Sequence, residues 1–215
     1  MKSINDHSIW TNKKVKLSIL VPTRDMVHTN FAFSLTQLVK TTESHGIETY
    51  VFFDSSTILL NQRERLIKMA QEVKSNYVLW LDSDMSFPST TAIRLLSHDK
   101  DIVGCNYLKR SKPVKPVAYF NTESWDNYLP LDHEDGLVKV EVVGMGCILM
   151  KLDLFNQIPK PYFEFKYKED TDDWYGEDYI LFNKLNDVGN EVFIDTKLSK
   201  QIKHIGLYSF GLKGK

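Results

Sequence analysis

A pair of aspartates directly follows a hydrophobic segment in the first half of the chain. Asp82-Ser83-Asp84 comes after Tyr77-Val-Leu-Trp-Leu81. Two carboxylates at positions i and i+2 can point to one place where a strand bends, and a hard divalent cation prefers such oxygen ligands together with substrate phosphates. Residues 170–172 have the same Asp-x-Asp spacing but lie in a polar, acidic stretch. The context therefore favours a cation and phosphate site at residues 82–84. The alternative is a pair of turn or helix-capping aspartates.

A second group of candidates stands at the start of a helical stretch. Trp174 is followed by Gly176, Glu177 and Asp178, and apolar residues with helical spacing come next. Either acid can serve as a general base, with Trp174 as a wall for the face of a sugar ring. The alternative is structural, because the helix dipole favours acids at a helix start. The same dipole leads us to expect that Asp178 is ionised at neutral pH.

His204 is the third candidate. A single histidine is more often structural than a ligand, but an imidazole that completes two carboxylates suits Mn²⁺ better than Mg²⁺. Residues 196–215 around it contain five lysines and no acid, so this segment either folds over a diphosphate or is a solvated end. The lysines are Lys197, Lys200, Lys203, Lys213 and Lys215.

Hydrophobic segments alternate with amphipathic ones in the first half of the chain. Such alternation implies a mostly parallel sheet with helices on both faces. Ligands of these sheets bind beyond the carboxyl ends of the strands, and the residues that follow the predicted strands are polar. The predicted strands are residues 16–21, 48–53, 77–81 and 101–105, and the predicted helices are residues 31–45, 59–73 and 88–96.

The second half differs in character. Prolines and scattered aromatic residues predict loops and hairpins over residues 109–140. Residues 138–143 alternate and residues 145–150 are continuously apolar, which predicts one long strand from the edge of the sheet to its core. A helix over residues 179–188 and a strand over residues 191–195 follow.

We therefore expect a single α/β domain over residues 1–215. Its mostly parallel central sheet is flanked by helices, with a smaller antiparallel part in the second half. A nucleotide-binding half (about 15–108) is completed by an acceptor-binding and metal-completing half (about 109–215).

Composition narrows the function classes. The 215 residues include 27 basic and 28 acidic ones, for a net charge of −1, whereas nucleic-acid binders usually carry a basic excess. Nucleic acid is thus a disfavoured partner, although Lys109, Arg110, Lys112 and Lys115 form a basic patch where an acidic acceptor could dock. The two cysteines lie in apolar stretches, no signal peptide is recognisable, and no apolar run approaches the roughly 20 residues of a membrane span. We expect a soluble, cytoplasmic protein.

Four motifs in order carry a resemblance to a known family. They are Asp82-Ser-Asp84 after a strand, Gly144-Met-Gly146 before a strand, Gly176-Glu-Asp178 before a helix, and His204-Ile-Gly206. In this order the chain resembles the GT-A-fold glycosyltransferases that carry an Asp-x-Asp motif, especially family-two-like enzymes and the small single-domain versions of phages. The resemblance spans roughly residues 15–206.

The resemblance implies a role for each matching residue. It places the base and ribose of a nucleotide at residues 22–24, the cation on Asp84 and His204, and the acceptor-side base at Asp178 or Glu177. Gly144 and Gly146 would let the backbone approach the donor sugar. The implied donor-binding residues are Pro22, Thr23, Arg24, Asp54, Arg63, Asp82, Ser83, Gly144, Gly146 and Lys213; the implied metal ligands are Asp82, Asp84 and His204; the implied catalytic residues are Asp178 and Glu177; and Trp174 is on the acceptor side.

The predicted activity is transfer of a hexose from a nucleoside diphosphate sugar, with UDP-hexose favoured, to an unidentified acceptor, with Mn²⁺ or Mg²⁺ as cofactor. Whether the reaction inverts or retains the anomeric configuration is open. One alternative is a sugar-nucleotide nucleotidyltransferase, but residues 22–28 lack the glycines of its usual phosphate loop. Another is a non-catalytic carbohydrate-binding module, which would not require Asp82, Asp84, Asp178 and His204 together.

Overall fold

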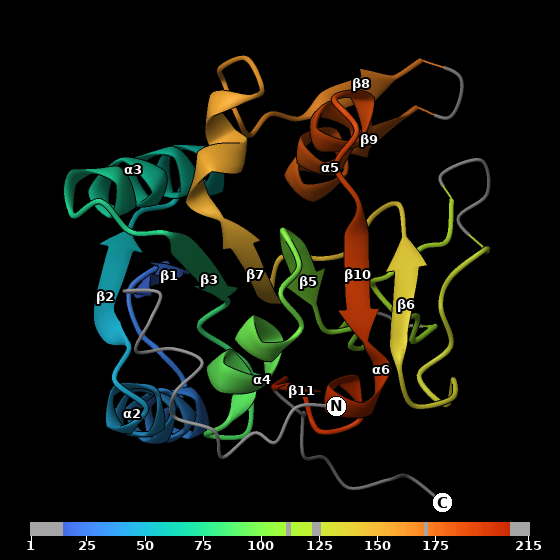
Figure 1. Ribbon diagram of the computed structural model, residues 1–215. Helices are drawn as coiled ribbons and strands as arrows, with labels where there is room; N and C mark the ends of the chain where they lie inside the picture. Colours follow the sequence, from blue (N-terminus) through green and yellow to red (C-terminus); the bar gives the residue numbers. More distant parts are fainter. Residues whose placement is uncertain (1–14, 111–112, 122–125, 170–171, 207–215) are drawn as a thin grey trace, which may run out of the picture.

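A seven-stranded sheet, in the order β2-β1-β3-β7-β5-β10-β6, forms the centre of the protein (Figure 1). The computed structural model describes residues 15–110, 113–121, 126–169 and 172–206, so Lys213 lies outside the described residues. The strands of this sheet are β1 (Lys16–Thr23), β2 (Glu48–Ser55), β3 (Tyr77–Leu81), β5 (Ile102–Gly104), β6 (Leu137–Val140), β7 (Cys147–Lys151) and β10 (Val192–Asp195).

Five of the seven strands run in one direction, as predicted for a mostly parallel sheet. β2 and β3 pair with β1 in parallel and β10 pairs with β5 in parallel, whereas β7 and β6 run antiparallel to their neighbours. Two small antiparallel sheets join β4 (Met85–Ser86) to β11 (Lys203–His204) and β8 (Lys166–Lys168) to β9 (Asp173–Tyr175). Both the α/β class and the smaller antiparallel part are thus confirmed.

Helices cover both faces of the sheet. Figure 1 shows α3, η1 and α5 on one face and α2, α4 and α6 on the other. Because both faces are covered, residues 17–21 of β1 and 78–81 of β3 are fully buried and mostly apolar. No helix in the described parts of the chain has the length and apolarity of a membrane span. The helices are α2 (Thr29–Ser44), α3 (Leu59–Glu72), α4 (Thr91–Ser97), the 3₁₀-helix η1 (Leu152–Asn156), α5 (Glu177–Asp187) and α6 (Thr196–Ser199).

The prediction of one long strand over residues 138–150 is wrong. β6 lies at the edge of the sheet against β10, and β7 lies in its middle between β3 and β5. The change from an alternating to a continuous apolar pattern therefore marks two strands with different surroundings. The chain turns between them at Gly144 and Gly146, where Tyr107 approaches too closely for any side chain at either position.

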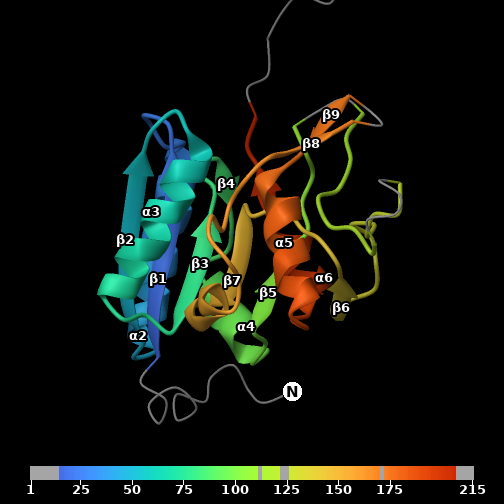
Figure 2. The ribbon, with the colours of Figure 1, turned by 90° about the horizontal axis from the view of Figure 1, so that it is seen from above.

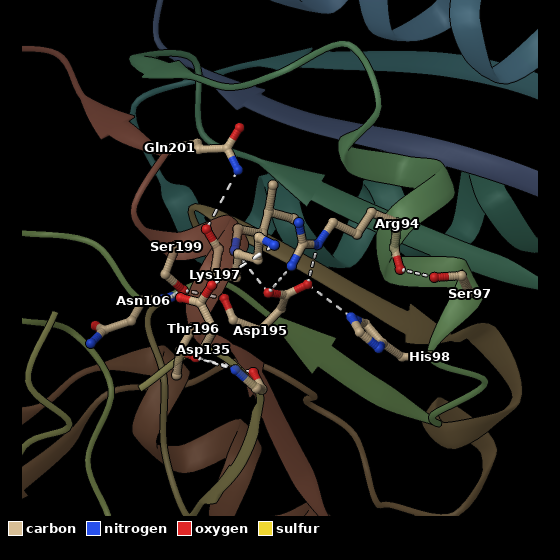
Figure 3. A network of polar contacts seen from close by, with 12 residues as sticks. Arg94, Ser97, His98, Asn106, Asp135, Asp195, Thr196, Lys197, Ser199 and Gln201 are labelled. Carbon is tan, nitrogen blue, oxygen red and sulfur yellow. Dashed lines mark hydrogen bonds and ion pairs between the residues drawn. The ribbon is translucent and has the colours of Figure 1, made fainter. Parts of the chain in front are cut away.

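Asp195, at the end of β10, is the centre of a saturated polar network (Figure 3). Its carboxylate accepts two hydrogen bonds from Arg94 at 2.5 and 2.8 Å, one from the backbone N–H of Leu198 at 2.8 Å, and contacts Nε2 of His98 at 2.8 Å. Burial raises the pKa of Asp195, but the bonds from His98, Arg94 and Leu198 outweigh it and hold the pKa at about 2. The Leu198 bond caps α6, so the network fixes the segment that leads into β11 and His204.

Asn106 anchors the segment after β5. Its backbone N–H donates to Oγ of Ser199 at 2.8 Å, and both residues are drawn in Figure 3. Its side-chain amide donates to the carbonyl of Leu129 at 2.7 Å and accepts from the backbone N–H groups of Val117 and Ala118 at 3.1 Å. The loops of the second half are thereby held against the sheet, and the position of the next residue, Tyr107, is set.

Candidate functional site

Polar side chains at the carboxyl ends of β1 and β3 line a cavity of about 650 Å³, here called the first cavity. A second cavity of about 690 Å³ adjoins it, and Arg110 and His204 line both. The candidates from the sequence that line the first cavity are Pro22, Thr23, Arg24, Arg63, Asp82, Ser83, Asp84, Glu177 and His204. Those that line the second cavity are Gly144, Trp174, Asp178 and His204.

Asp54 is separated from this set. Asp54 is not one of the described residues that line the first cavity. Its buried carboxylate accepts two hydrogen bonds from Arg65, both at 2.6 Å, so its charge is neutralised within the protein. Nothing in the sequence around Arg65 indicates that this residue would pair with Asp54. The implied donor-binding role of Asp54 stays a prediction that these contacts do not favour.

Gln62 holds the strand ends that form the wall of the first cavity. Its buried side-chain amide donates to the carbonyls of Thr23, Asp54 and Ser56, the last two at 2.9 and 3.0 Å. The carbonyls belong to the ends of β1 and β2, so one side chain ties the two strand ends together. The loop with Pro22, Thr23 and Arg24 is thus positioned from α3.

His204 faces Asp84 because β11 pairs with β4. His204 lies opposite Met85 in that pairing, and its Nε2 is 3.4 Å from Oδ1 of Asp84. Its Nδ1 is 2.9 Å from the carbonyl oxygen of Leu108, which fixes Nδ1 as the protonated nitrogen when the ring is neutral. The lone pair of Nε2 is then directed to the Asp84 side. A carboxylate and an imidazole held in this way are a donor pair that suits Mn²⁺.

Asp82 does not complete a three-ligand cluster with them. No group of three His, Cys, Asp or Glu side chains in the described part of the chain is arranged to hold a metal ion. The side chain of Asp82 is 31% exposed, and its Oδ1 lies 3.6 Å from Nη2 of Arg63. Burial raises the pKa of Asp82, and Arg63 opposes this shift. Asp84 and His204 thus form a facing pair with Asp82 beside it, and the implied metal-binding role of Asp82 stays a prediction.

Arg110 is a member of the site that the sequence placed only in a basic patch. Its Nη2 lies 2.8 Å from Oδ2 of Asp84, and its Nη1 donates to the carbonyl of Ile205 at 3.4 Å. The side chain is half exposed and lines both cavities. Asp84 therefore has a cationic partner on each carboxylate oxygen when His204 is protonated, and Arg110 marks the boundary between the cavities.

Arg63 brings a buried positive charge to the floor of the first cavity. Its side chain is 3% exposed, and its Nη2 lies 3.4 Å from Glu177 as well as 3.6 Å from Asp82. The guanidinium also lies over the rings of Trp80 and Phe163, at 5.3 and 5.9 Å. Its Nε and Nη1 have no hydrogen-bond partner among the described residues. Such an unsatisfied donor group is costly to bury, and a ligand is one way to satisfy it.

Glu177 and Asp178 form the first turn of α5. Gly176 is the N-cap residue, and no side chain in the described structure caps this helix. Oδ1 of Asp178 accepts the backbone N–H of Tyr179 at 2.8 Å. Burial raises the pKa of Asp178 to about 6, and the negative charge of Glu177 adds to this shift. Burial therefore opposes the ionised form, which the position at a helix start favours. Asp178 is still mostly ionised at pH 7, but it titrates close to neutrality.

Tyr107 is a site residue that the sequence did not single out. Its buried hydroxyl accepts the N–H of Gly146 at 2.8 Å, and its ring packs edge-on against His204. A Cβ atom at Gly144 or Gly146 would lie 2.6 or 2.5 Å from this hydroxyl. Glycine at these two positions thus makes room for the Tyr107 ring. The resemblance implies another purpose, which is to let the backbone approach a donor sugar. That approach stays a prediction for Gly144, which lines the second cavity.

Trp174 is presented to the second cavity by the β8–β9 hairpin. The side chain is 59% exposed and packs edge-on against Tyr167 of the opposing strand, with ring centres 5.2 Å apart. Figure 2 shows this hairpin at the end of the molecule toward which β2 points. A large exposed aromatic face on a cavity wall suits the apolar face of a sugar ring.

No protein-family model matches the sequence, and no curated protein matches it significantly. Among solved structures, the chain is similar to a protein from STIV designated A197, with a TM-score of 0.54 and 16% identity over 93% of this chain and 98% of that one. It is also similar to Drosophila β1,4-galactosyltransferase 7, solved as a mutant in complex with manganese, UDP-Gal and xylobiose. That likeness has a TM-score of 0.52 and 15% identity over 90% of this chain and 71% of that one. At these identities the likeness shows the fold, which is GT-A-like.

Proposed function

We propose that this protein is a glycosyltransferase of the Asp-x-Asp type, similar to family two, which transfers a hexose from a nucleoside diphosphate sugar to an acceptor. One observation carries the proposal: Asp84 and His204 face each other in the first cavity, and Asp178 lies in the second cavity, which adjoins the first at His204. Group transfer needs a site for the leaving group, a site for the acceptor and a base near the point where they meet. UDP is the favoured nucleotide because a structure with the same fold holds UDP-Gal and manganese.

The donor nucleotide is assigned to the first cavity. Pro22, Thr23 and Arg24, at the end of β1, are proposed to contact the base and ribose, and Asp82 and Ser83 the ribose. The cavity lies beyond the carboxyl ends of parallel strands, where ligands of such sheets bind. The half of the chain before residue 108 thus supplies the nucleotide contacts, and the rest supplies His204 and the acceptor side.

The proposed cation position is between Asp84 and His204. The residues fit a divalent cation of the Mn²⁺ type, because the carboxylate and Nε2 face the same space while Leu108 fixes the other ring nitrogen. When bound, the ion supplies Lewis-acid neutralisation of the charge that develops on the departing diphosphate. Asp84 would contribute the negative charge that attracts the ion, and Nε2 of His204 would be the second ligand.

Asp178 is the proposed acceptor-side base, with Glu177 beside it. In an inverting reaction the acceptor oxygen bonds to the anomeric carbon, the bond from that carbon to the diphosphate breaks, and the acceptor proton passes to Asp178. The diphosphate leaves with the electron pair of the broken bond. In a retaining reaction the donor phosphate takes the proton, and Asp178 stabilises the positive charge on the sugar. A carboxylate with a pKa of about 6 is well matched to proton transfer near neutral pH.

The binding of UDP tests the proposed function. We expect UDP affinity, measured by calorimetry, to rise at least about tenfold when EDTA is replaced by Mn²⁺, since the ion joins the protein to the diphosphate. Equal affinity in both conditions would remove the cation from the donor site.

Asp84→Ala tests the cation position in the same assay. We expect transfer to fall by about 10³-fold or more, because several kcal/mol of charge stabilisation on the leaving group are lost. UDP affinity should become independent of Mn²⁺, and the thermal midpoint should stay near that of the wild type. The matched control is Asp101→Ala, which removes a half-exposed aspartate that pairs with Lys151 at 2.6 Å, away from both cavities. Near-normal transfer by Asp84→Ala in saturating Mn²⁺ would reject the assignment.

A further inference from the structure

Arg110 brings a positive charge to the carboxylate where we place the cation. Its Nη2 lies 2.8 Å from Oδ2 of Asp84, while Nε2 of His204 lies 3.4 Å from the other oxygen of this carboxylate. Arg110 also lines both cavities, so its side chain lies where the leaving group and the acceptor are proposed to meet. Asp84 thus already has a cationic partner, and this partner belongs to the chain itself.

The Arg110–Asp84 pair is held more loosely than the Arg94–Asp195 pair. Arg94 reaches both oxygens of Asp195, at 2.5 and 2.8 Å, and that carboxylate is 1% exposed. The side chains of Arg110 and Asp84 are 52% and 25% exposed, and the two oxygens of Asp84 face different partners. Solvent screens such a pair and can hydrate either group, so the pair can open at a small cost in free energy.

The backbone beside the pair is fixed, which leaves the Arg110 side chain as the part that can move. The N–H of Ile205 donates to the carbonyl of Asp84 at 2.7 Å and continues the pairing of β11 with β4. The stem of Arg110 lies beside Gly206, where a Cβ atom would be 3.5 Å from the Cδ of Arg110. Nη1 of Arg110 donates to the carbonyl of Ile205 at 3.4 Å, which is long for a hydrogen bond. Rotation about the side-chain bonds can therefore turn the guanidinium away from Asp84 while the backbone stays in place.

A divalent cation and the Arg110 guanidinium compete for Asp84. Two positive groups on the oxygens of one carboxylate repel each other, so Arg110 opposes the binding of a cation by itself. A diphosphate in the first cavity changes this balance, because its oxygens supply negative charge for both positive groups. The planar fork of a guanidinium matches phosphate oxygens and can bind them through two nitrogens. A bound donor therefore offers Arg110 a second anionic partner in place of Asp84.

We propose, on the basis of the function above, that Arg110 takes the place of the cation on Asp84 until the donor binds, and then contacts the diphosphate of the donor. In this exchange the guanidinium leaves Asp84 and neutralises part of the charge on the leaving group. Displacement of Arg110 disfavours the cation alone, whereas the contact of Arg110 with the diphosphate favours the two ligands together. Binding of the cation and of the donor is thus coupled, and such coupling is reciprocal. Arg110 is then a donor-binding residue beyond those that the resemblance implies.

Two binding measurements on Arg110→Gln test the proposal through effects of opposite sign. Mn²⁺ binding without nucleotide, followed by electron paramagnetic resonance of the free ion, should tighten about three- to tenfold, because the competing charge is removed. UDP binding in saturating Mn²⁺, measured by calorimetry, should weaken about tenfold, because the contact with the diphosphate is lost. If Arg110 only held residues 205–206 in place, its loss would weaken both affinities. Unchanged or weaker Mn²⁺ binding by Arg110→Gln would therefore overturn the inference, and so would an unchanged UDP affinity.

Lys109→Gln separates the exchange from a general effect of charge. It removes an equal charge at the neighbouring position, where Nζ of Lys109 donates to the hydroxyl of Tyr119 at 2.8 Å on the wall of the second cavity. We expect it to change the affinity for Mn²⁺ alone by less than about twofold, because solvent screens charges that are not in contact. An increase as large as that of Arg110→Gln would show that the summed charge of the cavities weakens cation binding, and it would overturn the exchange at Asp84.

Arg110→Lys is the conservative variant. It keeps the charge but loses the planar fork of the guanidinium, so it should recover part of the UDP affinity that Arg110→Gln loses in saturating Mn²⁺. Its affinity for Mn²⁺ alone should stay closer to that of the wild type than to that of Arg110→Gln. The absence of any recovery of UDP affinity would overturn the contact of Arg110 with the diphosphate.

The same measurements on the wild type separate this inference from the proposed function. Mn²⁺-dependent UDP binding by the wild type, together with unchanged Mn²⁺ binding by Arg110→Gln, would overturn the role of Arg110 and leave the glycosyltransferase proposal standing. Equal UDP binding in EDTA and in Mn²⁺ would overturn the proposed function and the contact of Arg110 with the diphosphate. Tighter Mn²⁺ binding by Arg110→Gln would still support the competition for Asp84 in that case.

Discussion

Two clusters of buried charge differ in how fully their hydrogen bonds are satisfied. At the end of β10, the Asp195 carboxylate has four partners at hydrogen-bond distance, from Arg94, His98 and Leu198. At the floor of the first cavity, Arg63 makes ion pairs at 3.4 and 3.6 Å and leaves two nitrogens without a partner among the described residues. The first cluster holds the fold together, and the second is open to a ligand.

The pKa values of the carboxyls in the two regions move in opposite directions. Hydrogen bonds outweigh burial at Asp195 and hold its pKa at about 2, whereas burial beside Glu177 raises the pKa of Asp178 to about 6. An unsatisfied buried donor costs about 1–3 kcal/mol, so the cavity cluster weakens the fold. Such an arrangement persists where function needs it, which is why the difference points to the cavities as the site.

Asp195→Asn is expected to have the largest effect on stability. Asparagine keeps the shape of the side chain but removes the charge that pairs with Arg94, and loss of one partner of a buried pair costs about 3–5 kcal/mol. Urea denaturation would measure the free energy of unfolding. The control is Asp101→Asn, because the surface ion pair of Asp101 with Lys151 should contribute less than about 1 kcal/mol to the free energy of unfolding. Similar losses in both variants would show that the Asp195 network is no stronger than a surface pair.

Acid should affect stability and turnover in different pH windows. The folded-state pKa of Asp195 is held at about 2, below its unfolded value, so its contribution of about 2–3 kcal/mol is complete above pH 4 and is lost between pH 4 and 2. The pKa of Asp178 is raised, so its ionised form is lost already below pH 6, where we expect kcat to fall about tenfold per pH unit. The charged groups that set this pKa are Glu177, Arg63 and Lys109.

Measuring kcat across pH 4–8 and the free energy of unfolding across pH 2–8 checks both windows. Turnover should fall between pH 6 and 4.5 while stability holds, because protonation of the buried Asp178 carboxyl favours the folded state. If stability and kcat decline together around pH 6, global unfolding rather than Asp178 controls the activity.

Tyr107→Phe should have the smallest effect of this series. It removes the hydroxyl that accepts the Gly146 N–H, so the buried donor loses its partner at a cost of about 1–2 kcal/mol. Tyr50→Phe is the control, because the Tyr50 hydroxyl donates to Glu48 at an exposed position, and less than about 0.5 kcal/mol is expected there. Equal urea midpoints for the two variants would show that the hydroxyl does not hold the Gly144–Gly146 turn.

Local patterns in the sequence predicted the strands and the polar residues at their ends. The apolar runs that end at Pro22 and Asp82 are signals within one segment, and the structure has β1 and β3 there. The pattern over residues 138–150 was also informative, but whether it meant one strand or two depended on β10 and β5, which pair with the two parts.

Contacts between distant segments could not be read in this way. The Arg110–Asp84 pair and the fit of Tyr107 over Gly144 and Gly146 depend on how the chain after β5 returns to the sheet. Neither of these two contacts can be predicted from the sequence of one segment alone. The raised pKa of Asp178 could not be predicted for the same reason, because the burial that raises it comes from the tertiary structure and is absent from the isolated helix.

Asp178→Asn tests most directly the claim that the two cavities serve catalysis while the Asp195 network serves the fold. We expect kcat to fall by about 10²–10⁴-fold, as for loss of a general base, with little change in donor KM. The thermal midpoint should stay equal or rise, because asparagine can still accept the Tyr179 N–H while the buried charge, which costs roughly 1–3 kcal/mol at pH 7.5, is removed. Unchanged kcat together with a lowered midpoint would contradict the account and make Asp178 a structural residue of α5.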